Sequence, residues 1–369
     1  MKIAMLGHKY FPSREGGVER VVEELSTRMA ALGHEVTVYN RTNKYGNNKK
    51  IKEYNGVKVK HTFTINKKGY AAATSSFFGT LKVLFSRNKI VHYHAEGPCF
   101  WLKIIKIFSR KKVIVTIHGL DWQRAKWDSK ASAFIKIGEK RAAKYADKII
   151  VLSKNMQKYF KDTYNRDTIY IPNGVDKPIK KKADIINKKY GLKKDSYILY
   201  LGRLVPEKGI HYLIEAYNQL NTDKKLVIAG RESDTESYRD LLYSLSKRSR
   251  KNIIFTGFVQ GDTLRELYSN AYVYCLPSDL EGMPLSLLEA MSYGNCCVTS
   301  NIKELTEIID NNKLTFNKSD TEDLRQVLQK CCDNEKMVKQ YQNESQEYIL
   351  SKYNWDDVVK KTIDTYLKA

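Results

Sequence analysis

The chain has 369 residues, of which 42% are hydrophobic and 28% charged, as expected of a folded protein with room for two domains. Its formal net charge of +23 predicts attraction to an anionic partner, such as nucleic acid, lipid head groups or a phosphorylated substrate. No run approaches 18 uninterrupted apolar residues, which argues against a transmembrane helix, and the N-terminus turns polar too early for a secretory signal. Six cysteines, two pairs of them adjacent in sequence, make a poor disulfide framework and favour a reducing cytoplasm.

The first half of the chain begins with a β-α-β unit. An apolar strand at 2–7 is followed by a loop ending in Gly16-Gly17, a helix at 18–32 and a second strand at 35–39. The glycines do not have Gly-x-Gly-x-x-Gly spacing, so an ordinary dinucleotide site is not indicated. A tight turn and a close approach of the backbone to a diphosphate are both compatible with this pair.

Two basic segments follow. Residues 43–70 are rich in Asn and Lys, and an Asn-Gly pair within them predicts a short hairpin. The stretch 100–112 mixes apolar residues with lysines and arginines, which suits either a core-facing helix with solvated lysines or a helix at a membrane surface. Between them, His92 and His94 end a strand. Because no third ligand is in view, a place in a cleft is favoured over a metal site.

One histidine follows the carboxyl end of a predicted strand, which is where open α/β sheets bind their ligands. Residues 113–117 are predicted to form a strand, and His118 follows at its carboxyl end. A helix at 131–145 and a strand at 148–152 come next. A lysine-rich stretch at 177–196 is predicted to be a linker to the second domain.

The second half opens with a strand at 197–201, followed by Arg203 and Lys208 before a helix. Two cations beside a helix N-terminus suit an anion, whereas the alternative is an ordinary solvated loop. Further strands are predicted at 226–230 and 253–259, and turns beside them are candidates for holding a nucleobase.

A strand at 271–276 is followed by a glycine-containing loop and a helix with Pro284 in its first turn. This arrangement directs free backbone N–H groups and the positive end of the helix dipole at one point, which favours a phosphate. Glu281 lies on the loop and Glu289 on the helix. Two acceptor-only groups bracketing a phosphate site suit the hydroxyls of two sugars.

Glu281 and Glu289 resemble the Glu-x7-Glu motif of retaining glycosyltransferases with the GT-B fold, above all the large family 4. The surrounding Pro-Ser-…-Glu-Gly-Met-Pro-Leu-…-Leu-Glu-Ala-Met is similar to that family, and Gly-Arg-…-Glu-Lys-Gly at 202–209 resembles its diphosphate-binding segment. The string from His118 to Trp127 resembles a bacterial subgroup of rhamnosyltransferase-like enzymes in surface-polysaccharide pathways. The resemblance covers almost the whole chain.

The resemblance implies a role for each of these residues. His118 and Glu281 would act at the donor sugar, near the reacting carbon, and Glu289 would bind the ribose hydroxyls. Trp122 and Arg124 would face the acceptor. The remaining donor-binding positions would be Gly16, Gly17, Arg203, Lys208, Gly282, Met283, Pro284 and Leu285, with Gly257, Phe258 and Val259 at the nucleobase.

The expected fold is α/β, with the GT-B architecture of two Rossmann-like domains whose parallel sheets face an interdomain cleft. Residues 1–176 would form the acceptor-side domain, 177–196 the linker and 197–352 the nucleotide-sugar-binding domain. A terminal helix within 353–369 would pack back on the first domain.

The expected reaction is retaining transfer of a sugar from a nucleotide-diphosphate donor to an acceptor hydroxyl, such as that of a lipid-linked oligosaccharide in capsule, O-antigen or exopolysaccharide synthesis. No cofactor and no metal are expected, because Arg203, Lys208 and a helix N-terminus would neutralise the leaving phosphate. A front-face mechanism would need no enzymatic nucleophile. The lysines around 43–60 and 66–68, together with 100–112, predict docking on anionic lipid at the cytoplasmic face of the plasma membrane.

Two other functions remain open on the sequence. A nucleotide-sugar epimerase would use the same fold, but it requires acid and base groups at other positions and lacks this Glu-x7-Glu context. A nucleic-acid-binding protein is suggested by charge alone, and the basic residues lack a recognisable binding motif. Nucleic acid is therefore not an expected partner.

Overall fold

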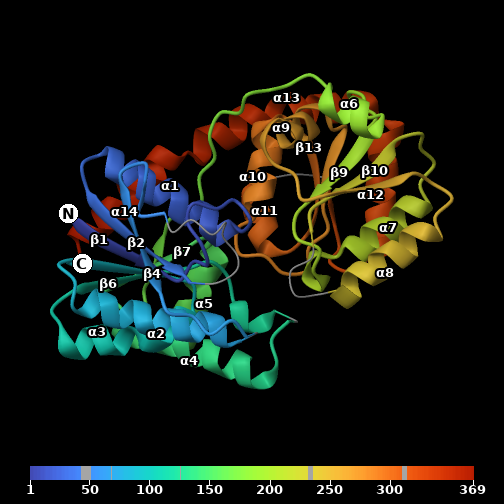
Figure 1. Ribbon diagram of the computed structural model, residues 1–369. Helices are drawn as coiled ribbons and strands as arrows, with labels where there is room; N and C mark the ends of the chain where they lie inside the picture. Colours follow the sequence, from blue (N-terminus) through green and yellow to red (C-terminus); the bar gives the residue numbers. More distant parts are fainter. Residues whose placement is uncertain (43–50, 68, 125, 232–235, 310–313) are drawn as a thin grey trace. The chain divides into compact units, whose positions relative to one another are not determined.

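The computed structural model describes residues 1–42, 51–67, 69–124, 126–231, 236–309 and 314–369. The chain divides into two compact units, each an α/β domain with a Rossmann-like sheet (Figure 1). Unit 1 comprises Met1–Gly174 and Trp355–Ala369, and unit 2 comprises Val175–Asn354. This organisation confirms the predicted α/β class with two parallel-sheet domains.

Unit 1 contains an eight-stranded sheet in the order β3-β4-β2-β1-β5-β6-β7-β8. Its strands are β1 (Lys2–Leu6), β2 (Glu35–Arg41), β3 (Glu53–Tyr54), β4 (Val57–Thr62), β5 (Ile90–His94), β6 (Lys112–Ile117), β7 (Lys148–Val151) and β8 (Ile169–Tyr170). All neighbours pair in parallel except β3 and β4, which form the predicted hairpin. Asn55 and Gly56 both have positive φ, as the tight two-residue turn requires.

Helices cover both faces of this sheet (Figure 1). They are α1 (Gly17–Ala31), α2 (Tyr70–Leu84), α3 (Leu102–Phe108), α4 (Ser129–Tyr145), α5 (Lys154–Tyr164) and α14 (Trp355–Leu367), with 3-10 turns η1 (Gly97–Trp101) and η2 (Asp121–Gln123). α1 and α14 contact each other on one face, while α2, α3 and α4 lie side by side on the other.

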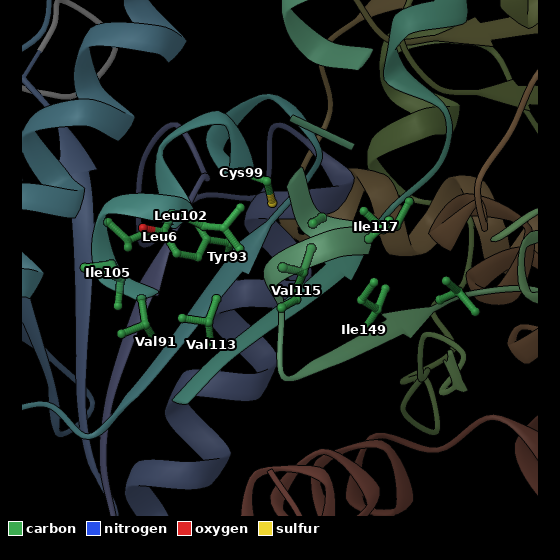
Figure 2. Packing of buried hydrophobic residues seen from close by; sticks show 14 of the residues in the cluster. Leu6, Val91, Tyr93, Cys99, Leu102, Ile105, Val113, Val115, Ile117 and Ile149 are labelled. Atoms are coloured by element: carbon green, nitrogen blue, oxygen red, sulfur yellow. The ribbon is translucent and has the colours of Figure 1, made fainter. Parts of the chain in front are cut away.

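The hydrophobic core of unit 1 lies between the sheet and the α2–α4 layer (Figure 2). Val91, Val113 and Val115 extend from the strands toward Leu102 and Ile105 of α3, and all five are fully buried. Burying side chains of this size stabilises the fold by about 1.5–3 kcal/mol each. Strands buried in this way carry continuous β-branched runs, which is why the sequence predicted them well.

Unit 2 contains a six-stranded, all-parallel sheet in the order β11-β10-β9-β12-β13-β14. Its strands are β9 (Tyr197–Leu201), β10 (Lys225–Ala229), β11 (Ile253–Gly257), β12 (Val273–Leu276), β13 (Cys296–Ser300) and β14 (Thr315–Phe316). Its helices are α6 (Ile185–Tyr190), α7 (Ile210–Asn218), α8 (Glu236–Lys247), α9 (Gly261–Asn270), α10 (Leu285–Ser292), α11 (Lys303–Ile309), α12 (Thr321–Asp333) and α13 (Glu335–Lys352), with the 3-10 turn η3 (Pro206–Lys208).

The lysine-rich stretch 177–196 is not the linker that its composition suggested. It belongs to unit 2 and contains α6, whose Ile186 is fully buried. The carboxylate of Glu266 accepts hydrogen bonds from the backbone N–H groups of Asp184 and Ile186, both at 3.0 Å. Apolar residues spaced among the lysines provide a buried side for this helix, while the lysines remain in water.

The chain enters unit 2 after Gly174 and returns to unit 1 at Trp355. A Cβ on Gly174 would lie 2.6 Å from the backbone nitrogen of Trp355, so glycine is required where these two segments meet. From there α14 packs in unit 1, where Asp356 pairs with Arg28 at 2.7 Å.

The basic segments of unit 1 are described in part. Residues 43–50 and Lys68 lie outside the described residues. Of the lysines predicted to meet lipid, those within 43–50 and Lys68 are therefore not described, whereas those at 52–60 and Lys67 are. The stretch 100–112 forms the end of η1 and α3, with Ile105 buried and Lys103 and Phe108 exposed. No helix within the described ranges has the length and hydropathy needed to cross a membrane.

Candidate active site

The predicted donor-binding segments meet at one edge of the unit 2 sheet. β9 lies between β10 and β12, so the chain leaves β9 on one side and later returns to its other side. Ligands bind at such switch points, outside the carboxyl ends of the strands. Arg203 and Lys208 follow β9, and the loop with Glu281 follows β12. Tertiary structure thus brings these two segments together at the switch point.

Lys208 and Glu281 form an ion pair at this edge. Lys208 Nζ lies 2.5 Å from Glu281 Oε1, and their side chains are only 13% and 7% exposed. The hydroxyl of Ser278 donates to the same carboxylate oxygen at 2.7 Å. Such a desolvated pair interacts more strongly than a surface pair, and loss of one partner leaves an uncompensated charge. The pair therefore holds a cation and an anion in fixed positions.

The two loops are also locked through their backbones. Gly209 has a positive φ of 63°, and a Cβ at this position would lie 2.1 Å from the carbonyl oxygen of Pro277. The N–H of Asp279 donates to the carbonyl of Glu207 at 2.9 Å. Gly209 therefore permits the close approach that sets Lys208 beside Glu281.

The helix carrying Glu289 begins beside this pair. Pro284 is the N-cap of α10 and not part of its first turn as predicted, because its backbone is extended. Leu285 begins the helix, and Gly282 and Met283 lie in the loop before it. The first N–H groups of a helix have no intrahelical acceptor, so they face outward from this end.

Glu289 lies one helical turn into α10 and is held from the neighbouring helix. The hydroxyl of Tyr268 donates to Glu289 Oε2 at 3.2 Å. Burial, and then the nearby Glu289 carboxylate, raise the pKa of Tyr268 well above its ordinary value. Tyr268 therefore remains a protonated donor that orients this carboxylate.

The predicted nucleobase residues lie two strands away from β9, at the carboxyl end of β11. Gly257 has a φ of 69°, and the ring of Phe258 is 40% exposed. The guanidinium of Arg231 lies 5.3 Å from the centre of that ring. Val259 follows in the same loop. These residues thus form a separate part of the carboxyl edge.

Unit 1 has a switch point of its own, around β1, which lies between β2 and β5. His8 follows β1, His94 ends β5 and His118 follows β6. Nδ1 of His94 and Nε2 of His118 share a hydrogen bond of 3.1 Å. His8 Nε2 bonds to the amide oxygen of Asn40 at 2.9 Å. The carboxyl edge of unit 1 therefore gathers imidazoles from three strands.

Burial keeps these imidazoles neutral. Desolvation lowers the pKa of His118 to about 4, although the nearby Asp121 carboxylate opposes the change. It lowers the pKa of His8 to about 4 and that of His94 well below its ordinary value. These rings therefore act as neutral hydrogen-bonding groups at neutral pH.

The other member of the His-x-His pair faces the core. His92 bonds to the hydroxyls of Tyr366 and Thr116, each at 2.7 Å, so both of its ring nitrogens are occupied. Its pKa is lowered to about 3 by burial. Among the described residues, no three His, Cys, Asp or Glu side chains cluster as a metal site would require.

The predicted acceptor residues are both held within unit 1. Trp122 donates its indole N–H to Glu139 Oε2 at 3.0 Å, and Arg124 pairs with Asp121 at 2.7 Å. Glu139 is fully buried and also accepts hydrogen bonds from the hydroxyls of two tyrosines, Tyr159 and Tyr164. These contacts fix the loop after β6 in one conformation.

A second buried carboxyl supports the same loop. Glu96 follows β5 and accepts a hydrogen bond from the N–H of Asp121 at 2.8 Å. Burial raises its pKa well above the ordinary value, and the nearby carboxylates of Glu139 and Asp121 add to this effect. Glu96 therefore anchors the loop that carries Trp122.

The glycine pair before α1 has two different environments. A Cβ on Gly16 would lie 2.1 Å from Glu19 Oε2, and the other oxygen of Glu19 accepts from the N–H of Lys9 at 2.9 Å. At Gly17, apart from its chain neighbours and the nearby backbone of its own helix, no atom lies within 4 Å of the Cβ position. Gly16 thus makes room for Glu19, whereas Gly17 leaves open space.

Several residues at these edges were missed from the sequence. His8 follows a strand just as His118 does, so the same positional signal would have found it. Glu139 lies inside a lysine-rich helix, where nothing in the sequence distinguishes it from a solvated glutamate. Ser278 likewise acquires its role only through Glu281.

The two parallel-sheet domains, each with polar groups at its switch point, define the GT-B class. Residues 15–177 match the model named Glycosyltransferase Family 4, and residues 182–348 match Glycosyl transferases group 1. The chain is therefore a glycosyltransferase of the GT-B type.

Similar proteins agree with this class. An uncharacterized glycosyltransferase of Methanocaldococcus jannaschii is 28% identical over 99% of this chain and 98% of its own length. A UDP-Gal:alpha-D-GlcNAc-diphosphoundecaprenol alpha-1,3-galactosyltransferase of Escherichia coli is 32% identical over 58% of each chain. In fold, sucrose-phosphate synthase from Thermosynechococcus elongatus matches with a TM-score of 0.86 at 20% identity, covering 99% of this chain and 98% of its own. Anabaena HepE in complex with UDP-glucose matches with a TM-score of 0.82 at 17% identity, covering all of both chains.

Proposed function

We propose that this glycosyltransferase moves a sugar from a nucleotide-diphosphate donor to a hydroxyl of a lipid-linked saccharide, with retention of configuration and without a divalent metal ion. The observation that carries the donor assignment is the buried pair of Lys208 and Glu281 at the switch point of unit 2. The HepE complex with UDP-glucose supports a nucleotide-sugar donor. The name of the Escherichia coli galactosyltransferase, with its diphosphoundecaprenol-linked acceptor, supports a lipid-linked acceptor.

In this proposal the leaving diphosphate lies against Lys208, Arg203 and the N-terminus of α10. Positive groups that are fixed before the reaction stabilise charge as it develops on the phosphate. The fixed ion pair suits this task, because Glu281 holds Lys208 in place and Ser278 holds Glu281. Glu281 would also bind the donor sugar. Gly282 and Met283 would let the backbone approach the phosphate.

Further donor contacts are part of the proposal. Glu289, oriented by Tyr268, would accept hydrogen bonds from the ribose hydroxyls. Gly257, Phe258 and Val259 would contact the nucleobase. The open space at Gly17 would admit the diphosphate.

His118 would hydrogen-bond the donor sugar near the reacting carbon as a neutral imidazole, while Trp122 and Arg124 would face the acceptor. The proposed reaction is a front-face one, in which the departing phosphate oxygen accepts the proton of the attacking hydroxyl. No enzymatic nucleophile is then needed.

The donor assignment is tested by thermal unfolding with a panel of nucleotide sugars, with nucleotide-linked rhamnose included because of the resemblance at 118–127. A donor present at 100 times its Kd adds about 2.7 kcal/mol to the free energy of unfolding. We expect one member of the panel to raise the Tm of the wild type and to have little effect on Arg203→Ala. Equal stabilisation of both proteins would place the donor elsewhere.

Metal independence is tested with a chelator. Transfer of labelled sugar to lipid-linked acceptor should persist in EDTA, because Arg203, Lys208 and the helix N-terminus substitute for a divalent ion. Complete loss of transfer that is restored by magnesium or manganese would contradict this part of the proposal.

A further inference from the structure

One face of unit 1 is strongly basic. The helices α2, α3 and α4 lie side by side there (Figure 1) and together contain eight Lys or Arg residues: Lys82, Lys103, Lys106, Lys130, Lys136, Lys140, Arg141 and Lys144. The only carboxylate of these three helices is that of Glu139, which is fully buried and accepts a hydrogen bond from the indole N–H of Trp122. The outer surface of these three helices therefore carries no negative side chain.

The same face exposes large apolar side chains. Phe85, which caps the C-terminal end of α2, is 86% exposed, and Ile107 and Phe108 at the end of α3 are 60% and 70% exposed. We call Phe85, Ile107 and Phe108, together with the exposed lysines Lys103, Lys140 and Lys144, the basic face. Exposed apolar side chains that lie together among polar residues are typical of an interaction surface.

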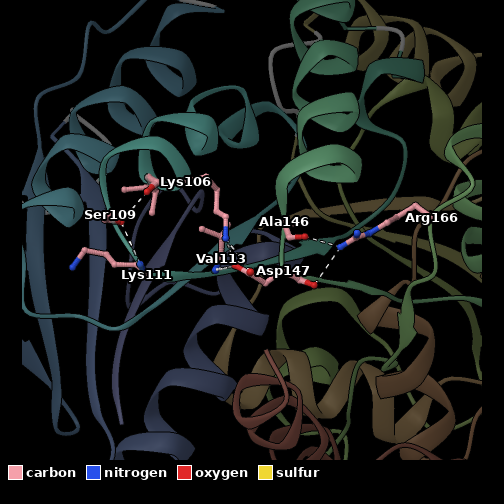
Figure 3. A network of polar contacts seen from close by, with 8 residues as sticks. Lys106, Ser109, Lys111, Val113, Ala146, Asp147 and Arg166 are labelled. Atoms are coloured by element: carbon pink, nitrogen blue, oxygen red, sulfur yellow. Dashed lines mark hydrogen bonds and ion pairs between the residues drawn. The ribbon is translucent and has the colours of Figure 1, made fainter.

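Contacts of α3 with the sheet determine which of its side chains face outward. Lys106 turns inward and pairs with Asp147 at 2.9 Å, and Asp147 also accepts from the N–H of Val113 at 2.7 Å (Figure 3). This fixes α3 against the sheet and leaves Lys103 and Phe108 on its outer side.

The members of the basic face are also held close to one another. Lys103 and Lys144 lie 5.6 and 5.5 Å from the centre of the same ring, that of Tyr145, so α3 and α4 present neighbouring ammonium groups. Lys111 donates to the carbonyls of Ser86 and Asn88, which brings the turn containing Phe85 beside the end of α3.

The opposite face of the sheet has a different character. Its helices α1 and α14 contain six carboxylates, Glu19, Glu23, Glu24, Asp356, Asp357 and Asp364, against four basic residues, Arg20, Arg28, Lys360 and Lys361. Several of these charges pair with one another, as Arg28 does with Glu24 and Asp356. The charge on the α2–α4 layer is thus a local feature and not a uniform consequence of the chain's composition.

We propose that the basic face docks unit 1 on an anionic lipid surface, with the lysines at the head groups and Phe85, Ile107 and Phe108 in the interfacial region. Lysines attract anionic lipid, and apolar side chains among them add burial that a soluble polyanion does not offer. The assignment deepens the proposed lipid-linked acceptor, on which it rests, by naming the surface that meets the membrane.

The contribution of the lysines to lipid binding is tested by sedimentation with vesicles of equal parts phosphatidylglycerol and phosphatidylcholine. Each lysine lost from a membrane contact lowers partitioning by roughly fivefold, so Lys140→Glu/Lys144→Glu should bind at least about 25-fold more weakly than the wild type. The matched control is Lys360→Glu/Lys361→Glu on α14, which changes the net charge equally and should stay within about twofold of the wild type. Equal losses in the two double variants would overturn the proposal.

The apolar component is tested with Phe108→Ser, matched by Leu32→Ser on the opposite face, where Leu32 is 64% exposed. Only Phe108→Ser should weaken vesicle binding, and high salt should weaken the binding of all variants. If Phe108→Ser has no effect and soluble polyphosphate competes fully with vesicles, the face is a polyanion site and the lipid assignment is wrong. Sedimentation does not depend on transfer activity, so this failure is distinguishable from failure of the donor or acceptor assignment.

Discussion

The two switch points of this protein have the same topology but hold different kinds of polar groups. In unit 2 the carboxyl edge holds an ion pair, Lys208 with Glu281, supported by Ser278. In unit 1 the equivalent edge holds imidazoles that burial keeps neutral, including His94 and His118. The same strand order thus places an ion pair of low exposure at the strand ends of one unit and a group of neutral imidazoles at the strand ends of the other.

The difference follows from what each polar group has beside it. Lys208 lies in a desolvated place in contact with the Glu281 carboxylate, so each charge compensates the other. For His118, the Asp121 carboxylate raises the pKa by less than burial lowers it. Fixed charges suit the leaving diphosphate of the proposed reaction, whereas neutral imidazoles suit the hydroxyls of a sugar. The following variants test that contrast.

The largest effect is expected at the charged edge. Arg203→Ala and Lys208→Ala should each lower turnover by roughly 10²–10³, the scale of losing one preorganised charge partner in a transition state. Lys247→Ala, an exposed lysine on α8, is the control and should leave turnover unchanged. Near-normal turnover in both edge variants would remove the proposed role of this edge.

These two substitutions should differ in their effect on stability. Lys208→Ala leaves the nearly buried Glu281 without its ion-pair partner, so it should lower the free energy of unfolding, whereas Arg203→Ala should not. Adding Glu281→Gln to Lys208→Ala should restore stability without restoring turnover. Chemical denaturation of the three variants provides the measurement.

A smaller effect is expected at the neutral edge. His94→Leu removes the hydrogen bond to His118 and should lower kcat by roughly tenfold, the scale of one hydrogen bond, because His118 loses its fixed orientation. His94→Asn places an amide N–H near the position of Nδ1 and should recover most of the loss. If His94→Leu and His94→Asn have the same kcat and the same Tm, the hydrogen bond to His118 does not affect turnover and His94 serves packing alone.

A separate effect concerns stability against pH. The pKa of His92 is about 3 in the folded protein, so between pH 6.5 and that value the unfolded state binds a proton that the folded state rejects. The contribution of the neutral His92 ring to the free energy of unfolding is therefore fully present above pH 6.5 and declines as the pH falls. The wild type should lose up to about 2 kcal/mol more than His92→Gln between pH 7 and 5.

Unfolding free energies of the two proteins at pH 7, 6 and 5 check this. The comparison isolates His92 from the other groups that titrate between pH 7 and 5. A constant difference between the two proteins would show that His92 is not held neutral.

Much of the fold was predictable because burial leaves a local signature. The apolar run at 113–117 and the Asn-Gly turn near residue 55 specify a strand and a hairpin by themselves. The prediction of a linker at 177–196 was wrong because lysine content dominated the composition, while buried Ile186 and its neighbours carried the helix.

For the candidate site, the sequence itself determined which residue types follow which strands: Arg203 and Lys208 after one, Glu281 after another, and His118 after a third. Only tertiary structure decided the partners, because Lys208 and Glu281 are 73 residues apart and meet only through the crossover order of the sheet. It likewise selected His94 as the partner of His118. Local sequence determines which residue types follow each strand. Contacts and desolvation between distant segments determine which of these residues form ion pairs and which are held neutral.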